Sequence, residues 1–321
     1  MARKTVKRKL ADGTVKTYSY ARGAEAPRLR TVETVAFEYR ASPQYRSLKP
    51  ASKKLYDRFL SSIVDEFGHI EIAKIKRRHV LAHRDAIASK PAMANELHKV
   101  WTKVLSFAVE REYIPYHPAL RIRKLAGGEH ARWPEALVER AMTPGVFPEH
   151  LRRAVVVAVY TGQRAGDCIR MTWADYDGTA IALVQQKTGK RMSVPCHSAL
   201  RKELDAWREE ARRDGKATTI LTRADGLPWS RPDLFSAVFG QLLRRTKDGK
   251  PVRPEFSGLV FHGLRKVAAA RLAEAGCSVH EIAAITGHST LSMVEHYTRE
   301  ADQLNRASAA ITKLENWRKG K

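Results

Sequence analysis

Five residues in the second half of the chain carry side chains that together could attack a phosphodiester and hold its charge. They are Arg164 in TGQRAGD, His262 and Arg265 in FHGLR, His288 in TGHST and Tyr297 in EHYTR. Two guanidiniums can neutralise the charge that develops on the non-bridging oxygens in a pentavalent transition state, a role that Mg²⁺ takes in other phosphoryl-transfer sites. The phenol of Tyr297 is then the candidate nucleophile.

The spacing of these residues suggests how the roles are divided. His262 and Arg265 stand at i and i+3 of a predicted helix, so both side chains can reach one phosphate. Attack by Tyr297 would form a phosphotyrosyl link and release a sugar hydroxyl, and a phenol with an ordinary pKa of about 10 needs neighbours that stabilise the phenolate. Lys187, at the tip of a predicted hairpin, is a candidate general acid for the leaving alkoxide. His262 and His288 would move protons or bond the phosphate.

Asp167 is expected to support the site from one turn beyond Arg164 by orienting nearby groups. Taken alone, each residue has a plainer interpretation. Asp167 could pair with Arg170 at i+3, Lys187 could be one of many surface lysines, and Tyr297 could be a packing residue. The order and spacing of the whole set carry the catalytic interpretation.

The charge of the chain indicates a polyanionic partner. Lys and Arg number 58 against 34 Asp and Glu, which gives a net charge of +24 over 321 residues. Many phosphate contacts displace many counterions, so double-stranded DNA is the simplest partner. A charge excess that serves only solubility is the alternative.

Neither a cofactor nor a membrane segment is expected. The three cysteines, Cys168, Cys196 and Cys277, lie far apart and form no CxxC or Cys/His ligand spacing, so they predict neither disulfides nor a metal site. No apolar run approaches the ~20 residues of a membrane span, and no signal-peptide pattern follows the basic N-terminus. We therefore expect a cytoplasmic protein associated with the nucleoid.

The domain organisation follows from composition and periodicity. Residues 1–30 hold nine Lys or Arg, and Asp12-Gly13 separates two alternating segments, which predicts a basic hairpin that either touches phosphates or is a flexible tail. Residues 31–125 are expected to form a helical DNA-binding domain, with amphipathic helices between Pro50 and Tyr113. The composition from Pro115 to Pro134 is typical of a linker, which we assign to residues 126–134.

Residues 135–321 are predicted to be a mainly helical second domain with a small antiparallel β-sheet. The sheet is a hairpin of AIALVQQ and RMSVPC between Thr179 and Pro195, turning at Lys187-Thr188-Gly189-Lys190. Helices are predicted from Arg164 and over 148–160, 200–214, 231–245, 262–275, 290–297 and 302–317. Gly276, a Ser278/Glu281 capping box and Gly287 delimit one more, which leaves His288 just past a helix end.

The ordered set Arg164, Lys187, His262, Arg265, His288 and Tyr297, the last nine residues after His288, resembles the tyrosine recombinases of the phage-integrase family. The resemblance implies cleavage of one strand at a time through a 3'-phosphotyrosine, strand exchange by way of a Holliday junction, and a homotetramer on DNA that needs no metal or nucleotide. It also implies that the apolar stripe of the last helix, Leu304, Ile311 and Leu314, docks on a neighbouring protomer; the alternative is that it folds back on its own domain. Many relatives carry Glu where this chain has Asp167.

Two other functions fit the same residues. A type IB topoisomerase relaxes supercoils with a similar tyrosine and similar cations, although the separate helical domain and the nine-residue spacing from His288 to Tyr297 favour recombination. A DNA-binding regulator that grips DNA without cutting it would have the same composition. Among recombinases, the basic residues 1–30 favour an integrase of a phage or mobile element over a resolvase of host chromosomes.

Overall fold

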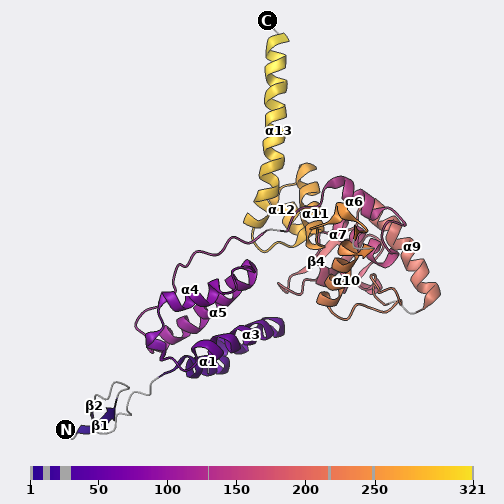
Figure 1. Cartoon of the computed structure of the whole chain (residues 1–321). Helices are drawn as coiled ribbons and strands as arrows, with labels where there is room; N and C mark the ends of the chain where they lie inside the picture. The colour runs from indigo at the N-terminus through magenta and orange to yellow at the C-terminus, as the bar shows by residue number, and fades with distance from the viewer. Residues whose placement is uncertain are drawn as a thin grey trace. The chain divides into compact units, whose positions relative to one another are not determined.

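The computed structural model describes residues 3–9, 15–21, 30–128, 130–215, 218–247 and 250–319. The chain divides into two compact units, Met1–Gly128 and Glu129–Lys321 (Figure 1). Both are built mainly from α-helices, with short antiparallel strand pairs, and this confirms the predicted fold class.

The first unit begins with a β-hairpin and continues as a helical bundle. Strands β1 (Arg3–Lys9) and β2 (Val15–Ala21) pair antiparallel, as predicted, whereas the predicted turn at Asp12-Gly13 lies outside the described residues. The bundle comprises α1 (Val32–Ala41), α2 (Pro43–Arg46), α3 (Pro50–Phe67), a 3₁₀ turn η1 (Ile72–Lys74), α4 (Arg77–Asp85) and α5 (Pro91–Glu110).

Amphipathic spacing explains the core of this bundle. Helix α3 buries Leu60 and Ile63, and α5 buries Leu97, Trp101 and Leu105, because residues three or four apart share a helix face. Helix α1 packs against both and was not predicted as an element of its own. The first turn of α1 is capped by Thr31.

Both ends of the stretch from Pro115 to Pro134, whose composition is typical of a linker, are packed. Ala119 and Ile122 are buried in the core of the first unit, and Trp133 is fully buried in the core of the second. Asn95 also exchanges two hydrogen bonds with the backbone of Leu125. The connecting segment is therefore shorter than its Pro- and Gly-rich composition suggests, because apolar residues within it have cores to enter.

The second unit contains the remaining elements. They are α6 (Glu135–Met142), α7 (Glu149–Thr161), α8 (Ala165–Cys168), η2 (Trp173–Asp175), β3 (Ala180–Val184), β4 (Arg191–Pro195), α9 (Ser198–Asp214), α10 (Pro232–Arg244), β5 (Thr246–Lys247), β6 (Lys250–Pro251), η3 (Pro254–Phe256), α11 (His262–Glu274), α12 (Val279–Thr286) and α13 (Ser292–Lys319). Strands β3 and β4 pair antiparallel from Ala180–Pro195 to Val184–Arg191, which confirms the predicted hairpin.

Two buried helices, α7 and α11, pack against each other at the centre of this unit. Helix α7 carries a run of β-branched valines that would favour a strand in isolation. Val155 and Val157 are nevertheless fully buried in a helix, because packing on nearly all sides outweighs this weak local preference.

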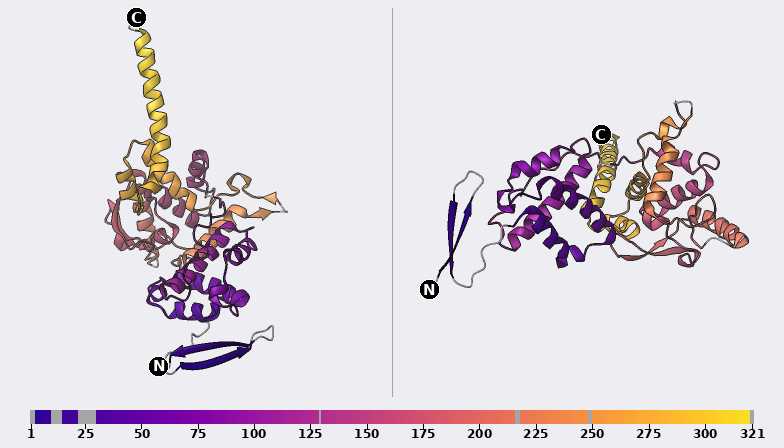
Figure 2. Two further views of the ribbon diagram at one scale, coloured as in Figure 1. Left: turned by 90° about the vertical axis from the view of Figure 1, so that its left-hand side faces the viewer. Right: turned by 60° about the horizontal axis from the view of Figure 1, so that its bottom comes forward.

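Two predictions for the helices of the second unit are wrong in detail. The helix predicted from Arg164 is only the four residues of α8, and Arg164 precedes it as the N-cap. The helices predicted over 290–297 and 302–317 are one continuous helix, α13, as the left view of Figure 2 shows. No Gly or Pro stands between Tyr297 and Asp302, so nothing in the backbone interrupts the helix.

Candidate active site

Arg265 lies in the first turn of α11 and is anchored by one of its two terminal nitrogens. Its Nη1 donates to the carbonyl oxygens of Gly162 at 2.7 Å and Thr286 at 2.6 Å. The residue is 3% exposed, and its Nη2 has no hydrogen-bond partner among the described residues. Burial and the nearby charge of Arg164 lower the pKa of Arg265 to about 10, and it remains a cation at neutral pH. A fixed guanidinium with an unused donor is suited to bind an anion.

The two carbonyls that hold Arg265 belong to Gly162 and Thr286, which lie at the ends of α7 and α12. These two helix ends are in close contact. Gly162 adopts a left-handed φ of 65° at the end of α7. A Cβ on Gly162 would lie 2.9 Å from Cγ2 of Thr286, so only glycine allows this approach. The helix ends thus present both oxygens to one guanidinium.

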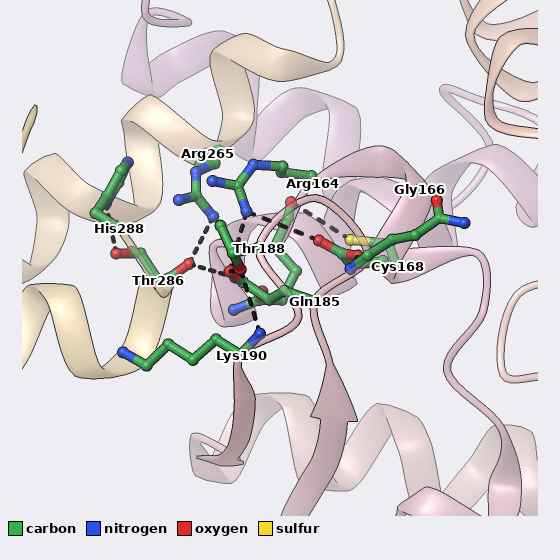
Figure 3. A network of polar contacts seen from close by, with 12 residues as sticks. Arg164, Gly166, Cys168, Gln185, Thr188, Lys190, Arg265, Thr286 and His288 are labelled. Atoms are coloured by element: carbon green, nitrogen blue, oxygen red, sulfur yellow. Dashed lines mark hydrogen bonds and ion pairs between the residues drawn. The ribbon is translucent and has the colours of Figure 1, made fainter. Parts of the chain in front are cut away.

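Arg164 is held beside the β3–β4 hairpin. Its Nη1 donates to Oε1 of Gln185 at 3.1 Å and lies 3.9 Å from Oδ2 of Asp167 (Figure 3). Its side chain is 20% exposed, so part of the guanidinium stays open to solvent. In Figure 3 the guanidiniums of Arg164 and Arg265 lie next to each other, and the charge of Arg164 is felt at Arg265 as a lowered pKa.

Asp167 connects α8 to the hairpin. Its Oδ1 accepts a hydrogen bond from the backbone N–H of Gln186 at 2.9 Å, and its carboxylate is buried. Arg170, the plainer partner considered for it, donates instead to the carbonyl of Gly166 and to the side chain of Gln186. The position of Asp167 is compatible with the orienting role expected for it.

His288 follows Gly287, which ends α12 in a left-handed conformation as predicted. Its Nδ1 lies 2.7 Å from Oγ1 of Thr286, and that hydroxyl donates to the carbonyl of Ile282 at 2.6 Å. Because the hydroxyl proton is used there, we assign the imidazole proton to Nδ1. Burial and the charges of Arg265 and Arg164 lower the pKa of His288 to about 3. Its Nε2 is then the unprotonated nitrogen of the ring at neutral pH.

His262 begins α11 and lies on the exposed side of the site. Its ring contacts the ring of His130, with 5.7 Å between the centroids. Desolvation and the charges of Arg265, His130 and Arg164 lower the pKa of His262 to about 4. In the protein without DNA, both candidate histidines are therefore neutral at pH 7.

Tyr297 lies on α13, where its half-buried ring packs against a small apolar cluster of α11, α12 and α13. Ala269, Ile282 and Val294 belong to this cluster. The phenol is close enough to Arg265 to raise the pKa of the guanidinium. The fold thus brings Tyr297 within electrostatic range of Arg265, although it stands 32 residues beyond Arg265 in the chain.

Lys187 is exposed on the turn between β3 and β4. This turn is closed by the hydrogen bond from Gly189 N to the carbonyl of Gln185 at 2.7 Å, and Gly189 supplies the positive φ of 74°. The structure places Lys187 on the loop next to Arg164, on the element that the sequence predicted.

Four residues with a place in this site were not singled out from sequence. Gln163, Gln185 and Thr286 form its buried polar framework, and His130 contacts His262. The sequence contained a signal for Gln185. Side chains alternate along β3, so Gln185 lies on the same face as Ile181 and Leu183, and the pattern predicts a buried polar side chain at this position. The role of Thr286 depends on contacts that sequence spacing does not show.

Among the described residues, no three His, Cys, Asp or Glu side chains are arranged to hold a metal ion. In the same part of the chain, no helix has the length and apolar character needed to cross a bilayer.

Comparison with known proteins shows the family. The model of the phage integrase family matches residues 135–304, and the chain belongs to that family. It is 30% identical over 157 residues to the integrase of Escherichia phage HK022, covering 47% of this chain and 42% of that one. It is 26% identical over 246 residues to the integrase of Escherichia phage lambda, covering 74% and 60%. The chain thus spans about half the length of these curated relatives.

The fold also matches a solved structure of an integrase. A lambda integrase tetramer bound to a Holliday junction superposes with a TM-score of 0.68 at 21% identity, covering 85% of this chain and 78% of that one. This likeness extends over both units of the chain and supports the mainly α-helical assignment of the fold.

Proposed function

We propose that this chain is a site-specific DNA recombinase of the phage or mobile-element integrase type. It cuts and rejoins DNA through a 3'-phosphotyrosyl intermediate. The observation that carries the proposal is the anchored Arg265: its Nη2 has no hydrogen-bond partner among the described residues, and its guanidinium lies within electrostatic range of Arg164 and Tyr297. Family membership and the net charge of +24 support it independently.

In the proposed cleavage step, the phenol oxygen of Tyr297 attacks the scissile phosphorus. A Tyr–O–P bond forms, the bond from phosphorus to the 5' oxygen breaks, and the negative charge on the non-bridging oxygens is held by Arg164 and Arg265. Nε2 of His288 takes the phenol proton once the phosphate is bound, because the negative charge of the phosphate offsets the charges of Arg265 and Arg164 that lower the pKa of His288 in the protein without DNA. His262 can hydrogen-bond the phosphate. Lys187 supplies the proton that the leaving 5' oxygen needs.

Rejoining reverses the same step with a 5' hydroxyl from another strand as the nucleophile. The energy of the broken phosphodiester is conserved in the phosphotyrosyl bond, so the exchange needs no nucleotide. Two guanidiniums supply the positive charge that a metal ion would otherwise provide.

We further propose that the protein acts as a homotetramer on double-stranded DNA at the nucleoid, with α13 as the assembly element. Ile311 is 55% exposed and Leu314 is 52% exposed on this helix. Two apolar side chains on one helical stripe, uncovered by their own unit, favour docking on a neighbouring protomer over folding back. The first unit is proposed to be a DNA-binding domain, and the basic β1–β2 hairpin an additional contact to phosphates.

Covalent capture tests the cleavage activity. A pool of duplexes with a randomised central segment is nicked so that a short leaving strand diffuses away after cleavage. The wild-type protein should form an adduct resistant to denaturant, and Tyr297→Phe should form none. If the wild-type protein captures no duplex above the level of Tyr297→Phe, the proposed function is wrong, and a DNA-binding regulator becomes the better description.

A second pair of assays separates recombination from relaxation. A type IB-like topoisomerase would relax a lone supercoiled plasmid that lacks the captured sequence, whereas a recombinase should join two captured sites in one plasmid. Relaxation without recombination would favour the topoisomerase.

A further inference from the structure

We propose that Gln185 is a positioning residue, which ties the turn carrying Lys187 to Arg164 and to the loop carrying His288. This inference rests on the proposed function, because it assigns Gln185 a part in the same cleavage step.

The side-chain amide of Gln185 is fully buried, and all of its hydrogen-bonding positions are used (Figure 3). Its Oε1 accepts from Nη1 of Arg164 at 3.1 Å and from Oγ1 of Thr188 at 3.0 Å. Its Nε2 donates to Oε1 of Gln163 at 2.7 Å and to the carbonyl of Thr286 at 2.9 Å. A primary amide has two acceptor and two donor positions, so this side chain is saturated.

These partners allow only one orientation of the amide. A flipped amide would direct an N–H₂ group at the Arg164 guanidinium and an oxygen at the carbonyl of Thr286, so both contacts would become repulsive. A saturated, buried amide of fixed orientation restrains its partners more than an exposed hydrogen bond does, because water cannot replace any of them.

The first restraint acts on the turn that carries Lys187. The backbone of Gln185 accepts from Gly189 at 2.7 Å and donates to Lys190 at 2.9 Å, and its side chain accepts from Thr188. Lys187 therefore stands on a turn that is attached to Gln185 by backbone and side chain together. Thr188 and Arg164 share one oxygen atom, so the turn and the guanidinium are set relative to each other.

The second restraint acts on the loop after α12. The carbonyl of Thr286 accepts from both Gln185 and Arg265, and the hydroxyl of Thr286 contacts His288. The amide of Gln185 thus connects the turn that carries Lys187 with Arg164 and Thr286. Thr286 in turn contacts both Arg265 and His288. A side chain at position 185 that is larger, or that cannot donate and accept the same hydrogen bonds, would displace Arg164, the turn and Thr286 together.

The test measures strand cleavage in single turnover with saturating protein, on the duplex recovered by covalent capture. Each variant is assayed on two versions of this duplex, one with the natural 5' oxygen and one with a 5'-bridging sulfur at the scissile bond. A thiolate leaves without protonation, so the sulfur duplex removes the need for a general acid. Lys187→Met is the reference and should be slow on oxygen but near wild type on sulfur.

The expected cleavage rates on the two duplexes differ between variants of Thr188 and variants of Gln185. Thr188→Val removes the two bonds of the Thr188 hydroxyl, to Oε1 of Gln185 and from the backbone N–H of Lys190, and leaves the amide of Gln185 in place. It should slow cleavage about tenfold on oxygen and less than about twofold on sulfur, while Thr188→Ser restores the wild-type rate. Gln185→Leu should slow cleavage about a hundredfold or more on oxygen and recover only in part on sulfur, because Arg164 is also displaced. DNA affinity should stay within about threefold. Gln241→Leu, at an exposed glutamine of α10, is the matched control.

The outcomes separate the inference from the function on which it depends. If the wild-type protein forms no adduct, the proposed function fails first. If the wild-type protein is active and a folded Gln185→Leu cleaves within about threefold of it, Gln185 is not a positioning residue. If Gln185→Leu does not fold, Gln185→Glu and Thr188→Val decide in its place. A Thr188→Val defect that sulfur leaves unchanged also overturns the inference, since the turn would then not position the acid.

Discussion

Arg265 donates to the carbonyl oxygen of Thr286 at 2.6 Å, so the guanidinium at the start of α11 is held by the last residue of α12. The end of one helix thereby fixes a cation that another helix carries. Nη1 makes both anchoring bonds, whereas Nη2 has no hydrogen-bond partner among the described residues. In the proposed function, Nη2 is therefore the nitrogen that can bind the phosphate. This relationship leads to several expectations.

Arg164→Ala should lower the cleavage rate by about 10²- to 10³-fold, and DNA affinity should fall far less. One preorganised donor is worth roughly 3 to 4 kcal/mol in the transition state, whereas it is one of many positive charges in binding. Single-turnover cleavage and a binding titration at one salt concentration check this. Arg231→Ala, at an exposed arginine of the same unit, should change neither quantity more than about twofold. Equal losses of rate and affinity would contradict the assignment.

Gly287→Ala should reduce both stability and cleavage. The residue has a φ of 70°, and a Cβ there would lie 2.3 Å from Nε2 of Gln185. Gly276→Ala is the matched control, since its φ of 85° carries the same strain but its Cβ would meet nothing within 4 Å. We expect the control to lose about 1 to 2 kcal/mol of unfolding free energy and retain activity. Denaturant titrations and cleavage assays that show no difference between the two variants would refute the proposed contact.

The stability contributed by His288 should decrease in acid. Its pKa of about 3 in the folded protein lies below the ordinary value of about 6.5, so the folded state binds this proton less readily than the unfolded state. The contribution is complete above pH 6.5 and is lost as the pH falls from 6.5 towards 3.

The measurement compares wild type with His288→Gln by denaturant titration at pH 7 and pH 5. Their difference in unfolding free energy should shrink at pH 5, by at most about 1.4 kcal/mol per pH unit and less after solvent screening of the half-buried ring. His280→Gln, at an exposed histidine of α12, is measured alongside as the control for replacing a histidine. A difference that stays constant would contradict the neutral His288.

Ile311→Glu combined with Leu314→Glu should impair assembly and spare cleavage. Both side chains are more than half exposed on α13, so the substitutions should leave the stability of the monomer unchanged. A charged stripe cannot bury itself against a partner. Complexes on DNA should shift from tetramer to smaller species in analytical ultracentrifugation, and recombination should fall with them. Lys313→Glu, between the two, is the control, and an unchanged tetramer would argue that the stripe has another role.

Adduct formation should persist in EDTA, because Arg164 and Arg265 can provide the charge neutralisation. The measurement is covalent capture with and without chelator. Loss of the adduct that only added Mg²⁺ restores would point to a different mechanism.

Elements whose hydrogen bonds join residues close together in the sequence were predictable. The S-x-x-E capping box at Ser278, the glycine that ends α12 and the β3–β4 hairpin all appear where the sequence placed them. The break predicted between Tyr297 and Asp302 does not exist, because no Gly or Pro there interrupts the backbone of α13. Composition did not reveal that Trp133, near the end of the predicted linker, is buried in the core of the second unit.

For the candidate site, the sequence by itself determined the chemical inventory and its order: two arginines, two histidines, a lysine and a tyrosine, on elements whose types it predicted except at Arg164, which precedes its helix. Only the tertiary structure decided that Gln185 meets Thr286 across 101 residues and that Arg265 meets Gly162 across 103. Caps and turns arise from hydrogen bonds between near neighbours, which spacing encodes directly. Contacts over such separations depend on how the helices pack, so residues as ordinary as a glutamine and a threonine acquire their place only when the chain is folded.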